Sequence, residues 1–221
     1  MQGLTDEVPK PMLEVEGRPM LAHILDNLQA AGLSEFLIVT GYRAGQIEEY
    51  FAGRPGVVFR RQEVRDGTAR AALAAREFAS GAPFVLTYAD ILTGPEVYRQ
   101  MAARVEGVEA VLAVKQVGDP WQGAAVYMEG DRVIRIVEKP PQGTSTTPWN
   151  SAGIYCFRES IFGRLAEVGL SPRGEYELTG AIAALLDSGA PAGWYAIPGW
   201  WRDVGRPEDL AVKIPAAGSS E

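Results

Sequence analysis

Apolar residues in the first half of the chain follow two alternating spacings. A stripe of Leu and Ile at i, i+3, i+4 and i+7 predicts an amphipathic helix over 18–31, with Pro19 in its first turn and Gly32 directly after it. Short apolar runs predict strands at 36–40, 56–60 and 83–88, and helical patterns lie between them at 44–51, 68–79 and 95–105. Strands that alternate with helices favour a mostly parallel sheet covered by helices on both faces.

The second half is richer in strands. Successive strands are expected at 110–117, 124–129, 133–138 and 152–157, followed by helices at 159–168 and 176–186 and a strand at 194–197. Polar and small residues at 142–148 indicate a loop, and 215–221 is expected to be a frayed tail. Because no repeat or long linker interrupts the pattern, we expect one α/β domain over 1–214.

Composition limits the class of protein. The 221 residues are 47% hydrophobic and 22% charged, which is too apolar for a disordered chain. No apolar run approaches the roughly 20 residues of a membrane span, and the acidic N-terminus does not resemble a secretory signal. The single cysteine, Cys156, excludes an internal disulfide and is expected in the core, which fits a cytoplasmic protein.

Charge and histidine content exclude further functions. The net charge of −7 argues against nonspecific nucleic-acid binding, although a local group of Lys and Arg together with a metal could still hold an anionic nucleotide. The only histidine, His23, is expected on the exposed side of its helix. A multi-histidine zinc site is therefore excluded, and a Ser-His-Asp triad is disfavoured.

Lys10 lies between two prolines in Pro9-Lys10-Pro11. Each proline restricts the backbone on both sides, so the ammonium group is a positioned point charge suited to phosphate oxygens. The alternative is a solvated lysine in a proline-rich turn.

Gln62 and Gly67-Thr68 form a second candidate group. A glycine before a helix lets a ligand approach the backbone at a helix N-terminus that favours anions, and a glutamine amide can pair with a pyrimidine. The alternative is a surface loop with Thr68 as the N-cap of its own helix.

Two aspartates are candidates for a metal site. Asp90 ends an apolar strand, and ligands of open α/β sheets bind beyond the carboxyl ends of strands. Mg²⁺ typically takes one or two carboxylates plus substrate phosphates, and Asp203 is the natural second carboxylate. The alternative for either aspartate is a turn or a helix cap.

Several motifs occur together in the order of a known family. Pro9-Lys10-Pro11 before a Gly-Arg-Pro helix start, Glu138-Lys139-Pro140, Asn150-x-x-Gly153 and Arg173-Gly-Glu make the chain resemble the sugar-1-phosphate nucleotidyltransferases over nearly its whole length. The resemblance implies a three-layer, Rossmann-like nucleotide-diphospho-sugar transferase fold with a mixed, mostly parallel sheet. It also implies a nucleotide-binding part at 1–107 and a sugar-binding part at 108–214.

The resemblance assigns a role to each matching position. It implies that Lys10 and Asp90 are catalytic and that Asp90 and Asp203 bind Mg²⁺. The implied nucleotide-binding residues are Lys10, Gln62, Gly67 and Thr68, and the implied sugar-phosphate-binding residues are Gly123, Glu138, Lys139, Asn150, Gly153 and Arg173.

The implied reaction joins a nucleoside triphosphate to a sugar 1-phosphate and releases pyrophosphate. A Gln62 amide suits thymine or uracil, whereas the sequence does not name the sugar and leaves a homo-oligomer open. Two alternatives remain at this stage. They are a non-catalytic sugar- or nucleotide-binding relative, and a cytidylyltransferase for a polyol or choline phosphate.

The chain departs from the family pattern at its start. The family's first strand and its Gly-x-Gly-Thr-Arg loop, which cradles the triphosphate, do not precede Lys10. Family members often contain Gly-Thr-Arg-Met, so we hypothesise that Met1 is an internal residue of a longer natural protein; without that loop, the 221-residue form is expected to have impaired activity. An in-frame stop codon directly before Met1 would contradict this. Gly180 and Arg206 also replace the usual Asp and Thr.

Overall fold

The computed structural model describes residues 3–215, which group into two compact units. The first unit comprises Met1–Glu63, Thr87–Arg99 and Pro198–Glu221, and the second comprises Val64–Leu86 and Gln100–Ile197. The units therefore interleave along the chain and do not follow the boundary expected near residue 107. The tail expected at 215–221 lies outside the described residues except for Pro215, and Met1 lies outside them as well.

The first unit begins with the 3-10 turn η1 (Lys10–Met12) and a hairpin of β1 (Glu14–Val15) and β2 (Arg18–Pro19). Both turn residues, Glu16 and Gly17, have positive φ angles (49° and 75°), as a tight hairpin turn requires. Helix α1 (Met20–Ala30) starts two residues later than expected, because Arg18 pairs with Val15 and leaves Pro19 as the N-cap.

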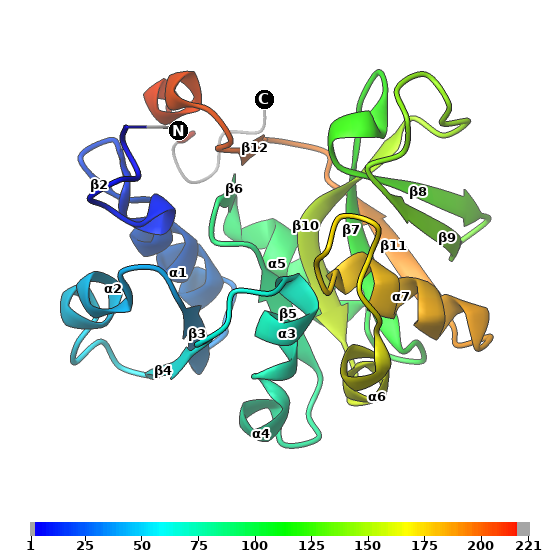
Figure 1. Ribbon diagram of the computed structural model, residues 1–221, viewed down its shortest axis with the longest axis horizontal. Coiled ribbons are helices and arrows are strands. Elements are labelled where there is room, and N and C mark those ends of the chain that lie inside the picture. Colours follow the sequence, from blue (N-terminus) through cyan, green and yellow to red (C-terminus); the bar gives the residue numbers. More distant parts are fainter. Residues whose placement is uncertain (1–2, 216–221) are drawn as a thin grey trace. The chain divides into compact units, whose positions relative to one another are not determined.

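The remaining elements of this unit form two small sheets (Figure 1). Strands β3 (Phe36–Thr40) and β4 (Val57–Arg61) pair in parallel, and α2 (Ala44–Tyr50) connects them along the chain. Strands β6 (Ile91–Thr93) and β12 (Trp201–Asp203) pair antiparallel, and η3 (Pro207–Ala211) follows. This last pairing brings the C-terminal segment into the first unit.

The apolar stripe of α1 is buried as predicted, but the position of His23 is not the expected one. Its ring is half-buried, and Nε2 lies 2.8 Å from the carbonyl oxygen of Val15. The unpredicted β1–β2 hairpin covers this side of the helix and supplies the hydrogen-bond partner.

A six-stranded sheet forms the centre of the second unit, in the order β5-β10-β7-β11-β9-β8. Its strands are β5 (Phe84–Thr87), β7 (Ala110–Gln116), β8 (Ala124–Glu129), β9 (Arg132–Glu138), β10 (Trp149–Phe157) and β11 (Ala192–Ala196). The mixed α/β fold is confirmed, but the sheet is less parallel than expected. Strand β11 runs parallel to β7, whereas β7–β10, β9–β11 and β8–β9 are antiparallel.

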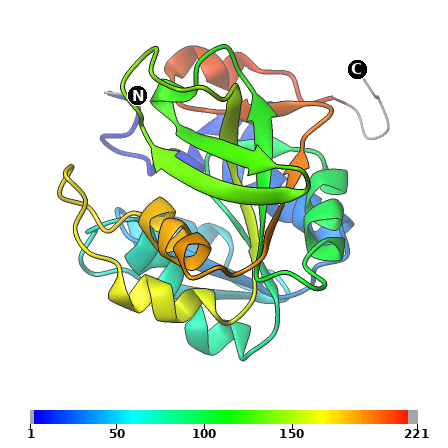
Figure 2. The same cartoon turned by 90° about the vertical axis from the view of Figure 1, so that its right-hand side faces the viewer.

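Helices α6 (Ile161–Glu167) and α7 (Leu178–Asp187) lie side by side in this unit (Figure 2), and α7 packs on β9. The predicted helix at 68–79 is two helices, α3 (Thr68–Leu73) and α4 (Arg76–Ala79). The other elements are η2 (Pro120–Gln122) and α5 (Pro95–Ala103), which continues from the first unit into the second. Cys156 is buried in β10 as expected, and burial raises the pKa of its thiol to about 12.

Candidate functional site

A charged cluster in the first unit brings together three of the predicted residues. Lys10 lies in η1, and its Nζ donates a hydrogen bond to Oδ2 of Asp90 at 2.6 Å. Both side chains are partly buried, with 31% and 28% of their surface exposed. Asp90 occupies the turn between β5 and β6, which Ile91 closes by donating its N–H to the carbonyl of Tyr88.

Asp203 joins this cluster from the other end of the chain. It is the last residue of β12, paired with Ile91, and the N–H of the following Val204 donates to the carbonyl of Asp90 at 2.9 Å. Partial burial of the carboxylate raises the pKa of Asp203, and the negative charge of Asp90 raises it further, whereas Lys10 opposes the shift. The two carboxylates therefore interact electrostatically, and a cation between them would relieve their repulsion.

These residues fit a magnesium ion that is bound in part by substrate. Residues 3–215 contain no group of three or more His, Cys, Asp or Glu side chains able to hold a metal alone. Mg²⁺ retains waters and commonly takes one or two carboxylates together with substrate phosphates. Asp90 and Asp203 match that donor set, and the ammonium group of Lys10 neutralises Asp90 in this structure.

The segment that leads to Lys10 is tied down through its backbone. Tyr42 donates its hydroxyl to the carbonyl of Asp6 at 2.6 Å, and Arg43 donates to the same oxygen at 2.9 Å. Gln46 donates to the carbonyl of Glu7 at 2.9 Å. Arg43 adopts a left-handed conformation with φ of 51°, an uncommon state for a side chain of this size. These bonds hold the chain just before the predicted phosphate-binding lysine.

Gln62 belongs to the first unit and directly follows β4. Its N–H donates to the carbonyl of Thr40 at 2.7 Å, which continues the β3–β4 ladder. Beside it, Arg61 makes two hydrogen bonds to Glu48, at 2.9 and 2.6 Å, which fix α2 to this strand. The position of Gln62 is thus well determined, and its role in base recognition stays a prediction.

Gly67 and Thr68 lie in the second unit, where they contact another part of the chain. Gly67 has a φ of 136°, and a Cβ atom there would lie 2.6 Å from the backbone nitrogen of Tyr176. The Oγ1 of Thr68 accepts a hydrogen bond from the N–H of Leu178 at 2.9 Å, so its side chain caps α7 and not α3. The sequence predicts that Gly67 lets a ligand approach the backbone, whereas in the structure the backbone of Tyr176 makes this close approach.

A second group of predicted residues surrounds the end of β9. Lys139 has a left-handed φ of 38°, and its N–H donates to the carbonyl of Gly123 at 2.7 Å. A Cβ atom at Gly123 would lie 2.8 Å from Nδ2 of Asn150, so a larger residue there would displace this amide. Asn150 donates Nδ2 to the carbonyl of Ser151, while its buried Oδ1 has no protein partner. An unsatisfied buried acceptor of this kind is suited to a ligand hydroxyl.

Arg173 connects this group to a carboxylate that the sequence analysis did not identify. Its NH1 lies 3.2 Å from Oε1 of Glu138, as a hydrogen bond, and 3.2 Å from Oε1 of Glu177, as an ion pair without hydrogen-bond geometry. Burial raises the pKa of Glu138, and the charge of Glu177 adds to this, while Arg173 and Lys139 oppose it.

Gly153 occupies an irregular part of β10. The register of β10 against β7 shifts between Ser151 and Tyr155, and Gly153 has a φ of 73° within this bulge. The hydroxyls of Ser151 and Tyr155 are hydrogen-bonded at 2.7 Å beneath it. A bulge re-aims the strand, which explains a glycine in a strand interior.

Sequence reasoning missed Tyr176 and Glu177. Both directly follow the Arg173-Gly-Glu motif in the sequence. The i,i+4 spacing of Arg173 and Glu177 could have suggested Glu177 as an ion-pair partner. Tyr176 is bonded to Asp66 and Ala69 through its backbone, which carries no residue-type signal, and its ring contacts Arg70.

Comparison with known proteins identifies the family. The model of the nucleotidyl transferase family matches residues 1–217. The chain belongs to the nucleotidyl transferase family. It is 32% identical over 211 residues to the bifunctional protein GlmU of Methanocaldococcus jannaschii, covering 95% of this chain and 49% of that protein. It is 30% identical over 217 residues to the UTP–glucose-1-phosphate uridylyltransferase AglF of Haloferax volcanii, covering 95% of this chain and 88% of that protein.

The fold of this nucleotidyl transferase family member matches solved structures. A UDP-glucose pyrophosphorylase in complex with UDP-glucose superposes with a TM-score of 0.85 at 21% identity, covering 96% of this chain and 90% of that one. The chain spans about half the length of the GlmU relatives that it matches. None of the helices within residues 3–215 has the length and apolar content needed to traverse a bilayer.

Proposed function

We propose that this nucleotidyl transferase family member is a sugar-1-phosphate nucleotidyltransferase. A phosphate oxygen of the sugar 1-phosphate attacks the α-phosphorus of a nucleoside triphosphate. The new O–P bond forms as the bond between the α-phosphorus and the bridging oxygen breaks, and the bridging oxygen leaves with pyrophosphate. No protein nucleophile takes part, so catalysis rests on positioning and charge stabilisation.

The observation that carries this proposal is the Lys10–Asp90–Asp203 cluster in a chain that matches the family over residues 1–217. Its combination of one ammonium group and two carboxylates suits a polyphosphate and a divalent cation. The relative AglF, which is named a UTP–glucose-1-phosphate uridylyltransferase, supports the same reaction class and a uracil base.

Magnesium is the metal that we propose for Asp90 and Asp203, where it would neutralise charge on the phosphates. Lys10 would exchange its bond with Asp90 for a phosphate oxygen of the triphosphate, and Gln62 would pair with the base. We also propose a cytoplasmic location, for which the lone and reduced thiol of Cys156 is the supporting feature.

On the sugar side, the proposal assigns the sugar hydroxyls to Glu138 and Asn150 and the sugar phosphate to Lys139 and Arg173. Support comes from the buried Oδ1 of Asn150, which has no protein partner, and from the guanidinium group held beside Glu138. The left-handed backbone of Lys139 is a local strain of the kind that accumulates at ligand sites.

Pyrophosphate release tests the function directly. The chain is incubated with Mg²⁺, one of UTP, dTTP, GTP, CTP or ATP, and a panel of sugar 1-phosphates that includes glucose 1-phosphate. Turnover with UTP or dTTP, lost on removal of the metal by EDTA, is the expected result. Binding of a triphosphate without release of pyrophosphate for every pair, both by this chain and by a form with the family's first strand and Gly-x-Gly-Thr-Arg loop added before Met1, would contradict the enzyme and favour a non-catalytic binding protein.

A further inference from the structure

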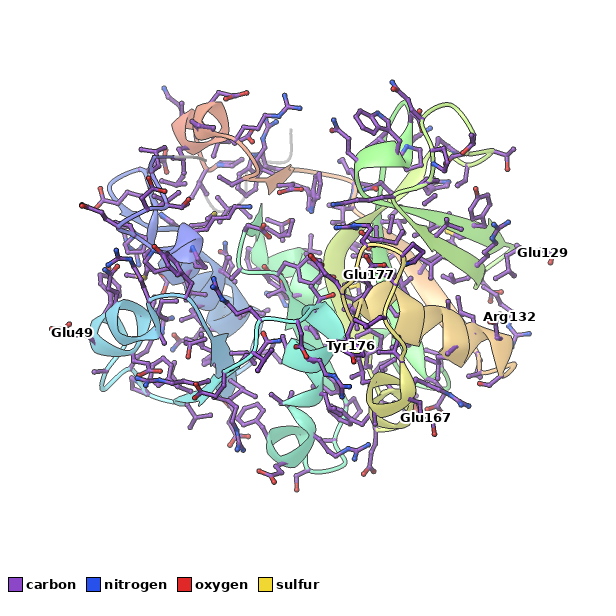
Figure 3. The ribbon with its side chains drawn as sticks, in the orientation of Figure 1. Glu49, Glu129, Arg132, Glu167, Tyr176 and Glu177 are labelled. Atoms are coloured by element: carbon purple, nitrogen blue, oxygen red, sulfur yellow. The ribbon has the colours of Figure 1, made fainter. Side chains whose placement is uncertain are left out.

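Two segments of the second unit, 66–70 and 173–178, are bonded to each other although about 110 residues separate them. The N–H of Tyr176 donates to the carbonyl of Asp66 at 2.8 Å, and the carbonyl of Tyr176 accepts from the N–H of Ala69 at 2.8 Å. Leu178 adds the bond to Thr68 described above. Figure 3 shows Tyr176 beside α3, whose first residue is Thr68.

The contact is close enough that the segments cannot slide independently. A Cβ atom on Gly67 would lie 2.6 and 2.7 Å from the backbone nitrogen and carbonyl carbon of Tyr176, distances that real Cβ contacts do not show. The loop before α3 is therefore packed directly against the backbone of Tyr176. The two segments are thus fixed to each other at this point of the structure.

The side chain of Tyr176 strengthens the same contact. The guanidinium carbon of Arg70 lies 4.2 Å from the centre of the Tyr176 ring, within the range of a cation–π interaction. Arg70 also faces Asp66 of its own segment at 4.0 Å, so the arginine that contacts the Tyr176 ring is itself paired within residues 66–70. Three hydrogen bonds and one cation–π pair thus join residues 66–70 to Tyr176 and Leu178.

The other end of the second segment carries Arg173, three residues before Tyr176. Its guanidinium group lies 3.2 Å from both Glu138 and Glu177. The segment that holds the predicted phosphate-binding arginine is therefore the one fixed to the predicted nucleotide-binding loop.

We propose that Tyr176 is a positioning residue that couples the loop at Gly67-Thr68 to Arg173, so that binding of the nucleoside triphosphate increases the affinity for the sugar 1-phosphate. This inference rests on the proposed function. A ligand that orders the loop also orders the segment bonded to it, and the second ligand then loses less conformational entropy on binding. The coupling is reciprocal, because it is a free energy shared by the two sites.

Calorimetric titration tests the coupling on the full chain. The affinity for α,β-methylene-UTP with Mg²⁺, which cannot turn over, is measured without and with saturating glucose 1-phosphate. We expect about tenfold tighter binding with the sugar phosphate, a usual size for such coupling. Tyr176→Leu and Arg70→Gln should reduce that factor below about threefold, while Tyr176→Phe, which keeps the ring under Arg70, should retain it.

Tyr127→Leu is the matched control. It removes a similar stacked pair in the same unit, in which Arg135 lies 5.2 Å from the centre of the Tyr127 ring, and it leaves residues 66–70 and 173–178 untouched. The coupling factor of this variant should equal that of the unmodified protein. If Tyr176→Leu does not fold by circular dichroism, Arg70→Gln carries the same comparison.

The outcomes separate the inference from the function on which it rests. Equal coupling in the unmodified protein and in Tyr176→Leu or Arg70→Gln, or no coupling in the unmodified protein, overturns the role of Tyr176 and leaves the enzyme standing. Failure of the chain to bind either probe contradicts the proposed function, and the inference falls with it.

Discussion

The cluster of Lys10, Asp90 and Asp203 and the contact between Gly67 and Tyr176 are held together in opposite ways. In the first, an ion pair of 2.6 Å joins side chains that remain 28–31% exposed. In the second, backbone hydrogen bonds of 2.8 Å and the missing Cβ of Gly67 bring two segments into contact. The first arrangement depends on charge, whereas the second depends on the close fit of two backbone segments.

Loss of the negative charge of Asp90 is expected to have the largest effect of the four changes, a fall in turnover. Asp90→Asn keeps the shape of the side chain but removes half of the proposed metal site and the partner of Lys10, so turnover should fall at least about 10³-fold with little change in fold. Pyrophosphate release measures it. Asp26→Asn, which changes a carboxylate paired with two arginines in the same unit, is the control and should retain full turnover. A decrease of less than tenfold for Asp90→Asn would argue against the metal site.

Addition of one methyl group tests the second arrangement. Gly67→Ala places a Cβ against the backbone of Tyr176 at a φ of 136°, and we expect about 3 kcal/mol lower stability. For a chain of this length that lowers Tm by roughly 10 °C, which differential scanning fluorimetry can measure. Gly107 also has a positive φ, of 78°, but open space around it, and Gly107→Ala should cost only about 1 kcal/mol. Equal losses in the two variants would mean that strain alone, without the contact, explains the glycine.

Glu138 allows a pH test within the second unit. Burial, and then the charge of Glu177, raises the pKa of Glu138 above its ordinary value, so the folded protein binds this proton more tightly than the unfolded chain. Ionisation of Glu138 therefore costs stability at neutral pH, and the cost vanishes below about pH 4. Glu138→Gln should be more stable than the unmodified protein by about 1 kcal/mol at pH 7 and equal to it near pH 4. Urea unfolding at both pH values measures this, and a variant that is less stable at pH 7 would contradict it.

Ionisation of Asp26, unlike that of Glu138, should stabilise the folded protein, and its effect on stability should be the smallest of the four. Burial alone would raise the pKa of Asp26, but hydrogen bonds from Arg18 and Arg54 outweigh it and hold the pKa below its ordinary value. The stabilisation is present above about pH 4 and disappears as the pH falls through the folded-state pKa. Because 43% of the side chain is exposed, Asp26→Asn should cost only about 0.5 kcal/mol at neutral pH. A difference that persists in urea melts at pH 2.5 would count against this account.

Features that depend on the chemistry of the side chains could be predicted from the sequence. The sequence predicts a phosphate-binding role for Lys10 and a metal site for Asp90 and Asp203, and the structure brings these residues together from positions up to 193 residues apart. Strand β3 was predicted with its observed ends because its apolar run is bounded on both sides. In each case the signal lies in the side chains themselves.

Features that depend on backbone geometry could not be predicted. The β1–β2 hairpin has strands of only two residues, too short for a periodic pattern. The break between α3 and α4 falls at Ala74-Ala75, where no glycine or proline marks it. Tyr176 joins its partners through its N–H and carbonyl, groups that nearly every residue possesses.

The anchoring of the chain before Lys10 has a consequence for how this region can vary in evolution. Tyr42, Arg43 and Gln46 hold the segment by the carbonyl oxygens of Asp6 and Glu7, and any amino acid at those two positions would offer the same oxygens. Asp6 and Glu7 can therefore be substituted without loss of these hydrogen bonds, whereas the residues that donate them cannot. In related proteins we expect positions 42, 43 and 46 to be more constrained than positions 6 and 7, although none of the five is a proposed substrate contact.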